Sequence, residues 1–273
     1  MTSSSAAPRS LLLREIADEL DRAARTGVPI PPPSAEHPDL DLLGAYKVQE
    51  INVRRALSRG DLCTGHKIGL TSRAMQEQLG VDQPDVGALL ASMNVPDGGT
   101  ATQPLLQPRI EAEIAFLLGA DLDAAELGID QVLAATEAVM PALEIIDSRI
   151  ANWKITLTDT VADNASSGAY VIGAPVPLPA DLRAVELVLT CDGEEVGRGV
   201  GSAALGHPAE CVAWLARTLR ARGEVLRAGS VILSGAVHAS VPVSPGQVFS
   251  VRSSVLGGVS VGFPAAAGTG VDS

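Results

Sequence analysis

Two glutamates separated by a single residue, Glu111 and Glu113, are the residues whose types and spacing most clearly suggest chemistry. Across residues 109–116, apolar residues alternate with Arg109, Glu111 and Glu113, and this period of two predicts a strand. Both carboxylates therefore point the same way, with Cα atoms roughly 7 Å apart, a span that their oxygens can bridge to one cation. Taken alone, such a pair is more typical of a solvated strand face.

A third glutamate, Glu144, changes this interpretation. It lies in an otherwise apolar run, residues 140–146, where a lone ionised carboxylate costs several kcal/mol unless something compensates it. Three carboxylates without a matching cluster of His or Cys form an oxygen-only site, which suits Mg²⁺ or Mn²⁺. Because three protein ligands leave coordination positions open for a substrate and water, the sequence predicts a catalytic metal site at Glu111, Glu113 and Glu144.

An anionic substrate at such a site needs nearby cations, because the formal net charge of the chain is −12. Lys67 lies between two glycines, where the backbone can approach a ligand closely, and we expect it to act as an acid or base. Arg109 adjoins the glutamate pair. Arg149 and Lys154 follow the third glutamate, and for both a charged surface is the more typical role.

Three polar features have two interpretations each. The hydroxyls and backbone amides of residues 163–168 favour a cradle for a carboxylate, although an ordinary Asx turn has the same composition. His207 stands directly before a predicted helix and is expected to do no more than begin it. His238 is an isolated loop histidine, for which solvation is the more typical role.

Short elements must position these residues. The spacing predicts disorder over residues 1–9 and a stiff proline-rich linker over residues 28–34. Helices are predicted over 10–27, with Ser10 as the cap, and over 42–59, 72–79, 130–139 and 208–222. Strands are predicted over 111–118, 142–146, 185–190, 230–234, 248–251 and 259–263. Because the two kinds of element do not alternate regularly, we expect a mixed α+β fold rich in antiparallel pairs.

The division that we expect is a helical N-terminal appendage over residues 1–62, a catalytic domain over 63–265 and a tail over 266–273. The acidic balance, with a pI near 4.7, argues against nucleic acid and anionic membranes as partners. Without a signal peptide or an apolar run of 18 residues, we expect a cytoplasmic protein. The odd, widely spaced Cys63, Cys191 and Cys211 argue against disulfides and zinc, and are expected to be buried.

Five longer motifs carry a resemblance to a known family. They are GHKIGLTSRAM (residues 65–75), QPRIEAEI (107–114), EIIDSRI (144–150), DTVADNASSG (159–168) and LGHP (205–208). In this order they resemble the family of 2-oxopent-4-enoate (2-hydroxypenta-2,4-dienoate) hydratases and 4-oxalocrotonate decarboxylases. The resemblance extends roughly from residue 42 to residue 263.

The resemblance implies the fold of the fumarylacetoacetate hydrolase C-terminal domain, a mixed β-sheet or β-roll with flanking helices. It also implies Mg²⁺ or Mn²⁺ on the same three glutamates, a homo-oligomer that can associate with a related family enzyme, and a small 2-oxo or enol acid as substrate. Enzymes of this family act in meta-cleavage degradation of aromatic compounds. Residues 83–87, 153–155 and 232–236 look more like the hydratases than the decarboxylases.

Within the hydratase interpretation, Lys67 and Asp85 are expected to move protons and position water, while Ser166, Ser167 and Arg109 bind the substrate. His66 departs from the family pattern, as do residues 237–240, and we expect both to border the substrate tail.

Three other functions stay open. Decarboxylation of 4-oxalocrotonate would use the same metal, and hydrolysis of an acylpyruvate would need a His–Glu dyad that we do not find. A non-catalytic scaffold or acid-binding subunit is disfavoured, because such a protein has no reason to retain unpaired buried charge.

Overall fold

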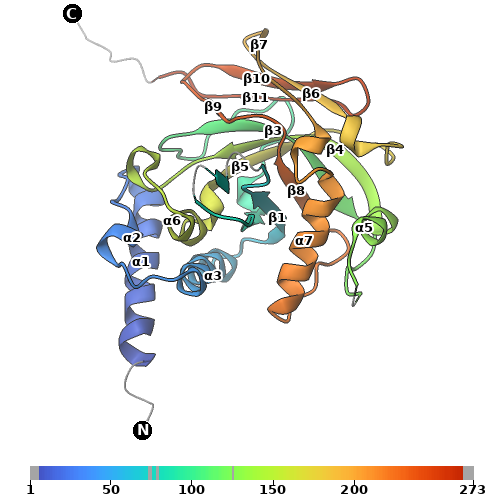
Figure 1. Cartoon of the computed structure of the whole chain (residues 1–273). Helices are drawn as coiled ribbons and strands as arrows, with labels where there is room; N and C mark the ends of the chain where they lie inside the picture. The colour runs from blue at the N-terminus through green and yellow to red at the C-terminus, as the bar shows by residue number, and fades with distance from the viewer. Residues whose placement is uncertain (1–5, 73–75, 78–79, 125, 267–273) are drawn as a thin grey trace, which may run out of the picture.

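The computed structural model describes residues 6–72, 76–77, 80–124 and 126–266. Its helices flank two stacked sheets (Figure 1). The helices are α1 (Ala6–Thr26), α2 (Pro33–Glu36), α3 (Leu42–Ser58), α5 (Ile129–Ala135), α6 (Leu157–Ala162) and α7 (Pro208–Ala221). Short 3-10 turns are η1 (Ala91–Met93), η2 (Ala151–Trp153), η3 (Asn164–Ser166), η4 (Leu182–Ala184) and η5 (Gly201–Ala203).

The larger sheet has seven strands, and its order places the predicted glutamate strand at the centre. The order is β2 (Asp85–Leu90), β1 (Cys63–Gly69), β8 (Val231–Ala236), β3 (Arg109–Leu118), β4 (Thr136–Ile146) and β5 (Ser167–Ile172), with β9 (Val241–Pro242) also paired to β3. Neighbours are antiparallel except β1 and β8. The predicted mixed α+β fold is confirmed.

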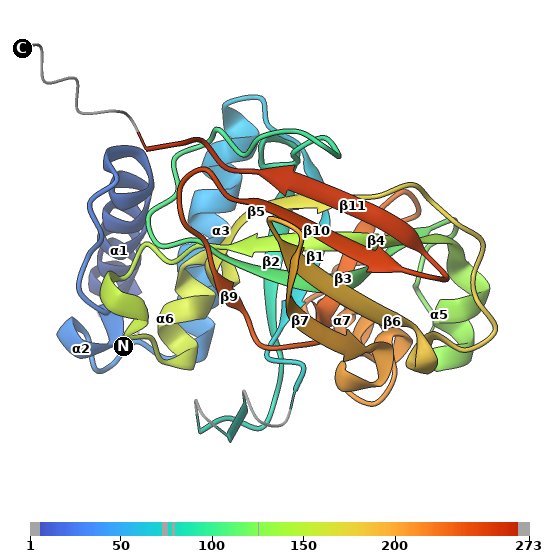
Figure 2. The same ribbon diagram turned by 90° about the horizontal axis from the view of Figure 1, so that it is seen from above.

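The smaller sheet has four strands that lie across β3 and β4 (Figure 2). Its order is β11 (Gly257–Gly262), β10 (Val248–Ser253), β6 (Glu186–Cys191) and β7 (Glu194–Val200). Fully buried Phe116 of the larger sheet and Phe249 of the smaller sheet belong to one core cluster. Burial of such side chains contributes about 2 kcal/mol each, so this apolar contact holds β3 and β4 rigidly.

The N-terminal helices pack on the body through a second cluster. Ile16 and Leu20 of α1 meet Val48 of α3 and Val161 of α6 there. In Figure 1 these helices lie together at one end of the sheet, with α5 and α7 at the other. The division at residue 62 stays a prediction.

Long-range pairing explains where the predicted boundaries were wrong. The helix predicted over 130–139 ends at Ala135, because residues 136–146 form β4, whose Ala138 and Val139 pair with β3. Strand burial therefore overrides the local helical periodicity. The first helix begins at Ala6, so residues 6–9 are helical and Ser10 lies inside the helix. Strands β1, β2, β5, β7 and β9 were not predicted.

Other local predictions had mixed outcomes. His207 does begin α7, since its Nδ1 accepts the backbone N–H of Ala209 at 3.0 Å. Cys211 is buried as expected, whereas Cys63 is exposed and Cys191 is half-buried. The proline-rich linker ends in the short helix α2. Residues 73–75 and 78–79 of the helix predicted over 72–79, and residues 267–273 of the tail, lie outside the described residues. Within the described residues, no helix is long and apolar enough to cross a bilayer.

Candidate active site

The pairing of β3 with β4 brings three glutamates together. Glu111 lies directly opposite Glu144 in the register, and Glu113 follows two residues later on β3. One carboxylate oxygen from each lies within 4.8 Å of the others. The three side chains are between 1% and 4% exposed. A cluster of three acids this dry is unstable unless protons or a cation neutralise it.

Most of the oxygens in this cluster have no hydrogen-bond partner among the described residues. They are Oε1 of Glu111, Oε1 of Glu113 and both oxygens of Glu144. By contrast, Oε2 of Glu113 accepts the backbone N–H of Gly235 at 2.7 Å. Burial, reinforced by the charge of Glu144, raises the pKa of Glu111 to about 8 and the pKa of Glu113 well above its usual range.

This donor set fits a hard divalent cation. Buried carboxylate oxygens that lack partners and converge within the span of one ion are the ligands that Mg²⁺ and Mn²⁺ prefer. A bound dication would offset the repulsion that raises the pKa of these groups.

Two further ionisable groups lie beside the cluster, Lys67 and Asp85. Nζ of Lys67 is 3.3 Å from Oε1 of Glu144, an ion pair without hydrogen-bond geometry. Burial alone would lower the pKa of Lys67. The nearby carboxylates, with Glu144 and Asp85 first among them, outweigh the effect of burial and raise the pKa of Lys67 above its ordinary value. Burial raises the pKa of Asp85, and Lys67 partly offsets that rise.

Gly69 allows these two groups to converge. A Cβ at this position would lie 2.2 Å from Oδ1 of Asp85 and 3.2 Å from Nζ of Lys67. Gly87, which faces Lys67 across β1 and β2, has a similar role, because a Cβ there would lie 3.0 Å from Cγ of Lys67. A side chain at Gly69 would displace the carboxyl group of Asp85, and one at Gly87 would meet the backbone carbonyl of Asn164 at 2.6 Å as well as the lysine.

A cavity of about 390 Å³, which we call the glutamate pocket, opens beside these groups. Its polar lining includes Lys67, Asp85, Arg109, Glu111, Thr160 and Ser166. Its apolar lining includes Ile68, Leu70, Ile146, Trp153 and Ile155. A pocket of this size, with a few convergent polar groups on an apolar wall, suits a small organic acid.

Arg109 supplies a cation at this pocket. Its guanidinium carbon lies 5.2 Å from the centroid of the Trp153 ring, and its Nη1 donates to Oγ of Ser240 at 3.4 Å. Among the described residues, no carboxylate forms an ion pair with Arg109. Its charge is therefore available to an anion in the pocket.

The structure separates the two serines that the sequence placed on one carboxylate. Ser166 lines the glutamate pocket, whereas Ser167 lines a different cavity. Arg149, expected on a charged surface, is instead buried and paired with Asp163, while Lys154 is exposed as expected.

Two residues have contacts that sequence reasoning missed. The hydroxyl of Thr160 lies 3.2 Å from Oγ of Ser166 and also lowers the pKa of Asp85, so it connects both groups. Its only signal in the sequence was its place in the 159–168 motif. His238, expected in solvent, is half-buried, and its Nε2 accepts the backbone N–H of Ala112 at 3.3 Å between the two β3 glutamates.

Residues 66–262 match the family described as fumarylacetoacetate (FAA) hydrolase C-terminal, which is more than half of the chain. The chain belongs to this family. It is 47% identical over 258 residues to the "TodF product hydratase" of Pseudomonas putida strain F1, covering 93% of this chain and 96% of that one. It is 48% identical over 252 residues to a "2-keto-4-pentenoate hydratase" of Paraburkholderia xenovorans, covering 91% and 94%.

A solved structure is similar over nearly the whole length. The 4-oxalocrotonate decarboxylase from Pseudomonas putida G7, complexed with magnesium and adipate, has a TM-score of 0.89 and 39% identity, covering 93% of this chain and 98% of that one. The resemblance and the fold that the motifs predicted are therefore confirmed. The relative's bound magnesium also supports a divalent metal cofactor for the family.

Proposed function

We propose that this protein is a hydratase that adds water to 2-hydroxypenta-2,4-dienoate or a homologue and forms a 4-hydroxy-2-oxo acid. The observation that carries the proposal is the buried trio of glutamates with unpartnered oxygens, of which Glu111 lines a small pocket together with Lys67 and Asp85. The hydratases at 47% and 48% identity support the choice of reaction.

The three glutamates would hold Mg²⁺ or Mn²⁺. Such an ion supplies Lewis-acid stabilisation of negative charge on the carboxylate and the 2-oxygen of the substrate. The remaining work is proton transfer, because net hydration removes protons from the 2-hydroxyl group and from water, and delivers protons to C5 and C3.

Lys67 and Asp85 suit the two directions of transfer. The raised pKa of Lys67 keeps it an ammonium group at neutral pH, so it can deliver a proton to carbon. Burial raises the pKa of Asp85 and Lys67 partly offsets that rise, so the carboxylate of Asp85 is more basic than usual and can accept the proton that water loses on attack at C4. We assign the acid role to Lys67 and the base role to Asp85.

The pocket walls orient the substrate. Ser166 offers a hydroxyl to the substrate carboxylate, and Thr160 holds that hydroxyl at 3.2 Å while it also contacts the base. Arg109, without a carboxylate partner among the described residues, attracts the same anion.

Decarboxylation of 4-oxalocrotonate is the second candidate. The decarboxylase at TM-score 0.89 favours it, and so does Arg109, whose free charge suits a second carboxylate. Both reactions use the same glutamates and differ in which acid the pocket accepts.

One experiment separates the candidates. Protein saturated with Mg²⁺ or Mn²⁺ is given 2-hydroxypenta-2,4-dienoate and 4-oxalocrotonate separately, while dienol absorbance and carbon dioxide release are followed. We expect water addition to the first acid. Carbon dioxide from the second acid without hydration of the first would establish the decarboxylase instead.

Two variants test the proposed acid. Lys67→Met should lower kcat by roughly 10²- to 10⁴-fold, the usual contribution of a positioned proton donor. Lys154→Met removes an exposed lysine from outside the pocket and should leave kcat unchanged. Equal turnover in the two variants would refute the role of Lys67.

The proposal includes a cytoplasmic location, an assembly of identical subunits and association with a related family enzyme. These parts rest on the family resemblance. The formal net charge of −12 also agrees with a protein that does not bind nucleic acid or anionic lipid, because both would be repelled.

A further inference from the structure

One wall of the glutamate pocket is built on a strained backbone turn. Asn152 and Trp153, in η2, both line the pocket, and their φ angles are 59° and 55°. Residues other than glycine adopt such positive angles only where surrounding contacts impose them. The contacts that impose this turn therefore decide where the ring of Trp153 lies.

Gln107 supplies these contacts, and both polar atoms of its side chain are used. Its Nε2 donates to the carbonyl of Ser148 at 3.0 Å and to that of Ile150 at 2.9 Å. Its Oε1 accepts the backbone N–H of Asn152 at 2.7 Å, and its backbone carbonyl accepts the Nε1–H of Trp153 at 3.1 Å. Gln107 thus fixes both the turn and the indole ring.

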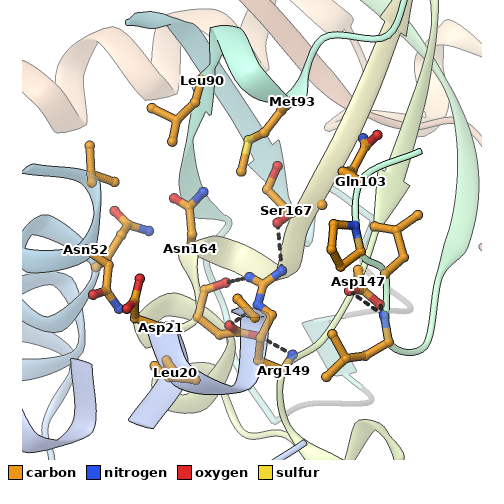
Figure 3. Close-up of a pocket in the computed structure, with 18 of the residues that line it drawn as sticks. Leu20, Asp21, Asn52, Leu90, Met93, Gln103, Asp147, Arg149, Asn164 and Ser167 are labelled. Carbon is orange, nitrogen blue, oxygen red and sulfur yellow. Dashed lines mark hydrogen bonds and ion pairs between the residues drawn. The ribbon is translucent and has the colours of Figure 1, made fainter. Parts of the chain in front are cut away.

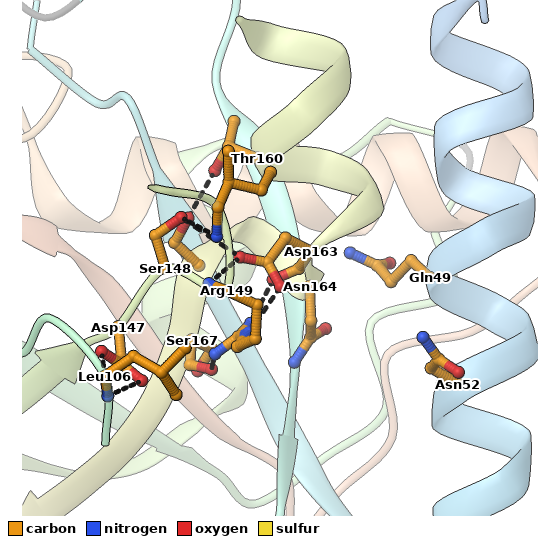
Figure 4. A network of polar contacts seen from close by, with 12 residues as sticks. Gln49, Asn52, Leu106, Asp147, Ser148, Arg149, Thr160, Asp163, Asn164 and Ser167 are labelled. Carbon is orange, nitrogen blue, oxygen red and sulfur yellow. Dashed lines mark hydrogen bonds and ion pairs between the residues drawn. The ribbon is translucent and has the colours of Figure 1, made fainter. Parts of the chain in front are cut away.

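The loop after β4, to which this amide is bonded, is itself anchored by buried groups (Figure 4). Oδ1 of Asp147 accepts the backbone N–H of Gln107 at 2.6 Å. The carboxylate of Asp163 accepts Nε of Arg149 at 2.5 Å and the backbone N–H of the same residue at 2.9 Å. Figure 3 shows the guanidinium of Arg149 also directed at Ser167, whose carbonyl it reaches at 2.9 Å. These contacts hold the loop, and with it the Gln107 amide, in one position.

The indole ring that Gln107 fixes lies against Arg109. The distance of 5.2 Å between the guanidinium carbon and the ring centroid is within the range of a cation–π contact. The guanidinium also donates to Oγ of Ser240, but at 3.4 Å this contact is longer than a typical hydrogen bond. The position of the Trp153 ring therefore restricts where the guanidinium can point.

We propose that Gln107 and Trp153 are positioning residues that hold the Arg109 guanidinium at the glutamate pocket, where it binds the carboxylate of the substrate. This inference rests on the proposed function, in which Arg109 attracts that anion. Because neither residue moves a proton in the reaction, loss of either should weaken binding of the acid. In steady-state kinetics we expect KM to rise about tenfold while kcat stays within about twofold of the wild type.

Binding of an unreactive acid tests the inference without turnover. 2-Oxopentanoate has the carboxylate and the 2-oxygen of the substrate but no carbon–carbon double bond to hydrate. Its dissociation constant from the full-length protein saturated with Mg²⁺ is measured by calorimetry. Gln107→Met and Trp153→Leu should each weaken binding about tenfold, roughly the contribution of one hydrogen bond to a charged group. Trp153→Phe keeps an aromatic face for the guanidinium and should lose at most about threefold.

A matched control makes the same exchange four residues earlier in the chain. Gln103→Met removes an amide whose nitrogen has no hydrogen-bond partner among the described residues, and Gln103 does not line the glutamate pocket. We expect this variant to bind 2-oxopentanoate as the wild type does.

Arg109→Met separates positioning from general damage to the fold. If Gln107 and Trp153 act through the guanidinium, Gln107→Met and Trp153→Leu should cause no further loss of binding in the Arg109→Met background. A residue that touched the acid itself, or that only stabilised the protein, would keep its full effect there.

Fluorescence of Trp153 provides a second measurement. The chain has two tryptophans, so Trp214→Phe leaves Trp153 as the only one. In that background Gln107→Met should raise the acrylamide quenching constant at least twofold, because the turn that holds the ring is released. Gln103→Met should leave the quenching constant unchanged.

Three results would overturn the inference. They are no saturable binding of 2-oxopentanoate to the wild type, full and additive losses in the Arg109→Met background, and unchanged quenching of Trp153 in Gln107→Met. Hydration is assayed separately. Wild-type protein that binds 2-oxopentanoate but adds no water to 2-hydroxypenta-2,4-dienoate would refute the proposed reaction and leave the positioning role intact.

Discussion

Binding of a divalent ion at the three glutamates should release protons near neutral pH. In the metal-free protein the pKa of Glu111 is raised to about 8. At pH 7 such a carboxyl group is about 0.9 protonated, and it must lose that proton before it can ligate a metal. Glu113, whose pKa is also raised well above the usual range, adds up to about one more proton.

Calorimetric titration with Mn²⁺ at pH 7, in PIPES and in Tris, measures this release from the difference in buffer ionisation heat. We expect the release of about 0.9 to 2 protons for each ion bound. Between pH 6 and pH 8 the dissociation constant for Mn²⁺ should fall about tenfold per pH unit for each proton released. Glu137→Gln changes an exposed carboxylate on β4, the strand of Glu144. It is the control and should release as many protons as the wild type.

A release below about 0.3 proton, with a dissociation constant that does not change between pH 6 and pH 8, would refute the reasoning. Such a result would mean that the carboxyl groups of the metal-free cluster are already ionised at pH 6. Thermal unfolding provides a second check with a defined sign. The pKa of Glu111 is raised from 4.5 to about 8 in the fold, so metal-free stability should fall as pH rises through that window. The gain in Tm on adding Mn²⁺ should therefore be larger at pH 8 than at pH 6.

Three further substitutions have defined outcomes. Thr160→Val, which keeps shape but removes the hydroxyl beside Ser166, should lower kcat/KM about tenfold and alter its pH profile, and Thr160→Ser should restore both in steady-state kinetics. Arg149→Met leaves Asp163 buried without its partner and should cost about 3–5 kcal/mol in urea unfolding at pH 7. This deficit should shrink below pH 6, where Asp163 takes up a proton; an equal deficit at both pH values would contradict the pairing. His207→Ala should cost about 1 kcal/mol through loss of the α7 cap, whereas His207→Asn should cost less in the same assay.

The sequence pattern around each glutamate was sufficient to predict the glutamate cluster, because the direction of these side chains depends only on neighbouring residues. A strand period of two places Glu111 and Glu113 on one face whatever the rest of the chain does. Glu144 was identified by an energetic argument, since its apolar surroundings leave a charge without compensation. That argument did not require knowledge of the register that places it opposite Glu111.

Features that depend on long-range pairing were not predicted. Residues 136–139 have helical periodicity, yet they extend β4 because β3 is beside them. The charge of Arg149 suggested a surface, and only the fold shows Asp163 satisfying it in the interior. His238 similarly lies in the chain between β8 and β9. Its Nε2 accepts a hydrogen bond from the backbone N–H of Ala112 on β3, a residue that neither β8 nor β9 pairs with.

The serine pair shows most clearly why adjacency in sequence does not imply a shared role. Asn164, Ala165 and Ser166 all have positive φ, between 51° and 54°, so the chain reverses direction within η3 before β5 begins at Ser167. Such conformations are strained for residues other than glycine, and they persist only where surrounding contacts impose them.

Those contacts come from both sides of the turn. The side chain of Asn164 bonds the backbone N–H and carbonyl of Ala88 at 2.8 and 2.9 Å, while Arg149 holds the carbonyl of Ser167. The strained turn therefore turns Ser166 toward the glutamates and Ser167 toward the helices, so that one short segment forms the wall of two cavities. The same rigidity that positions one hydroxyl at the glutamate pocket thus leaves the next hydroxyl buried and without a hydrogen-bond partner among the described residues.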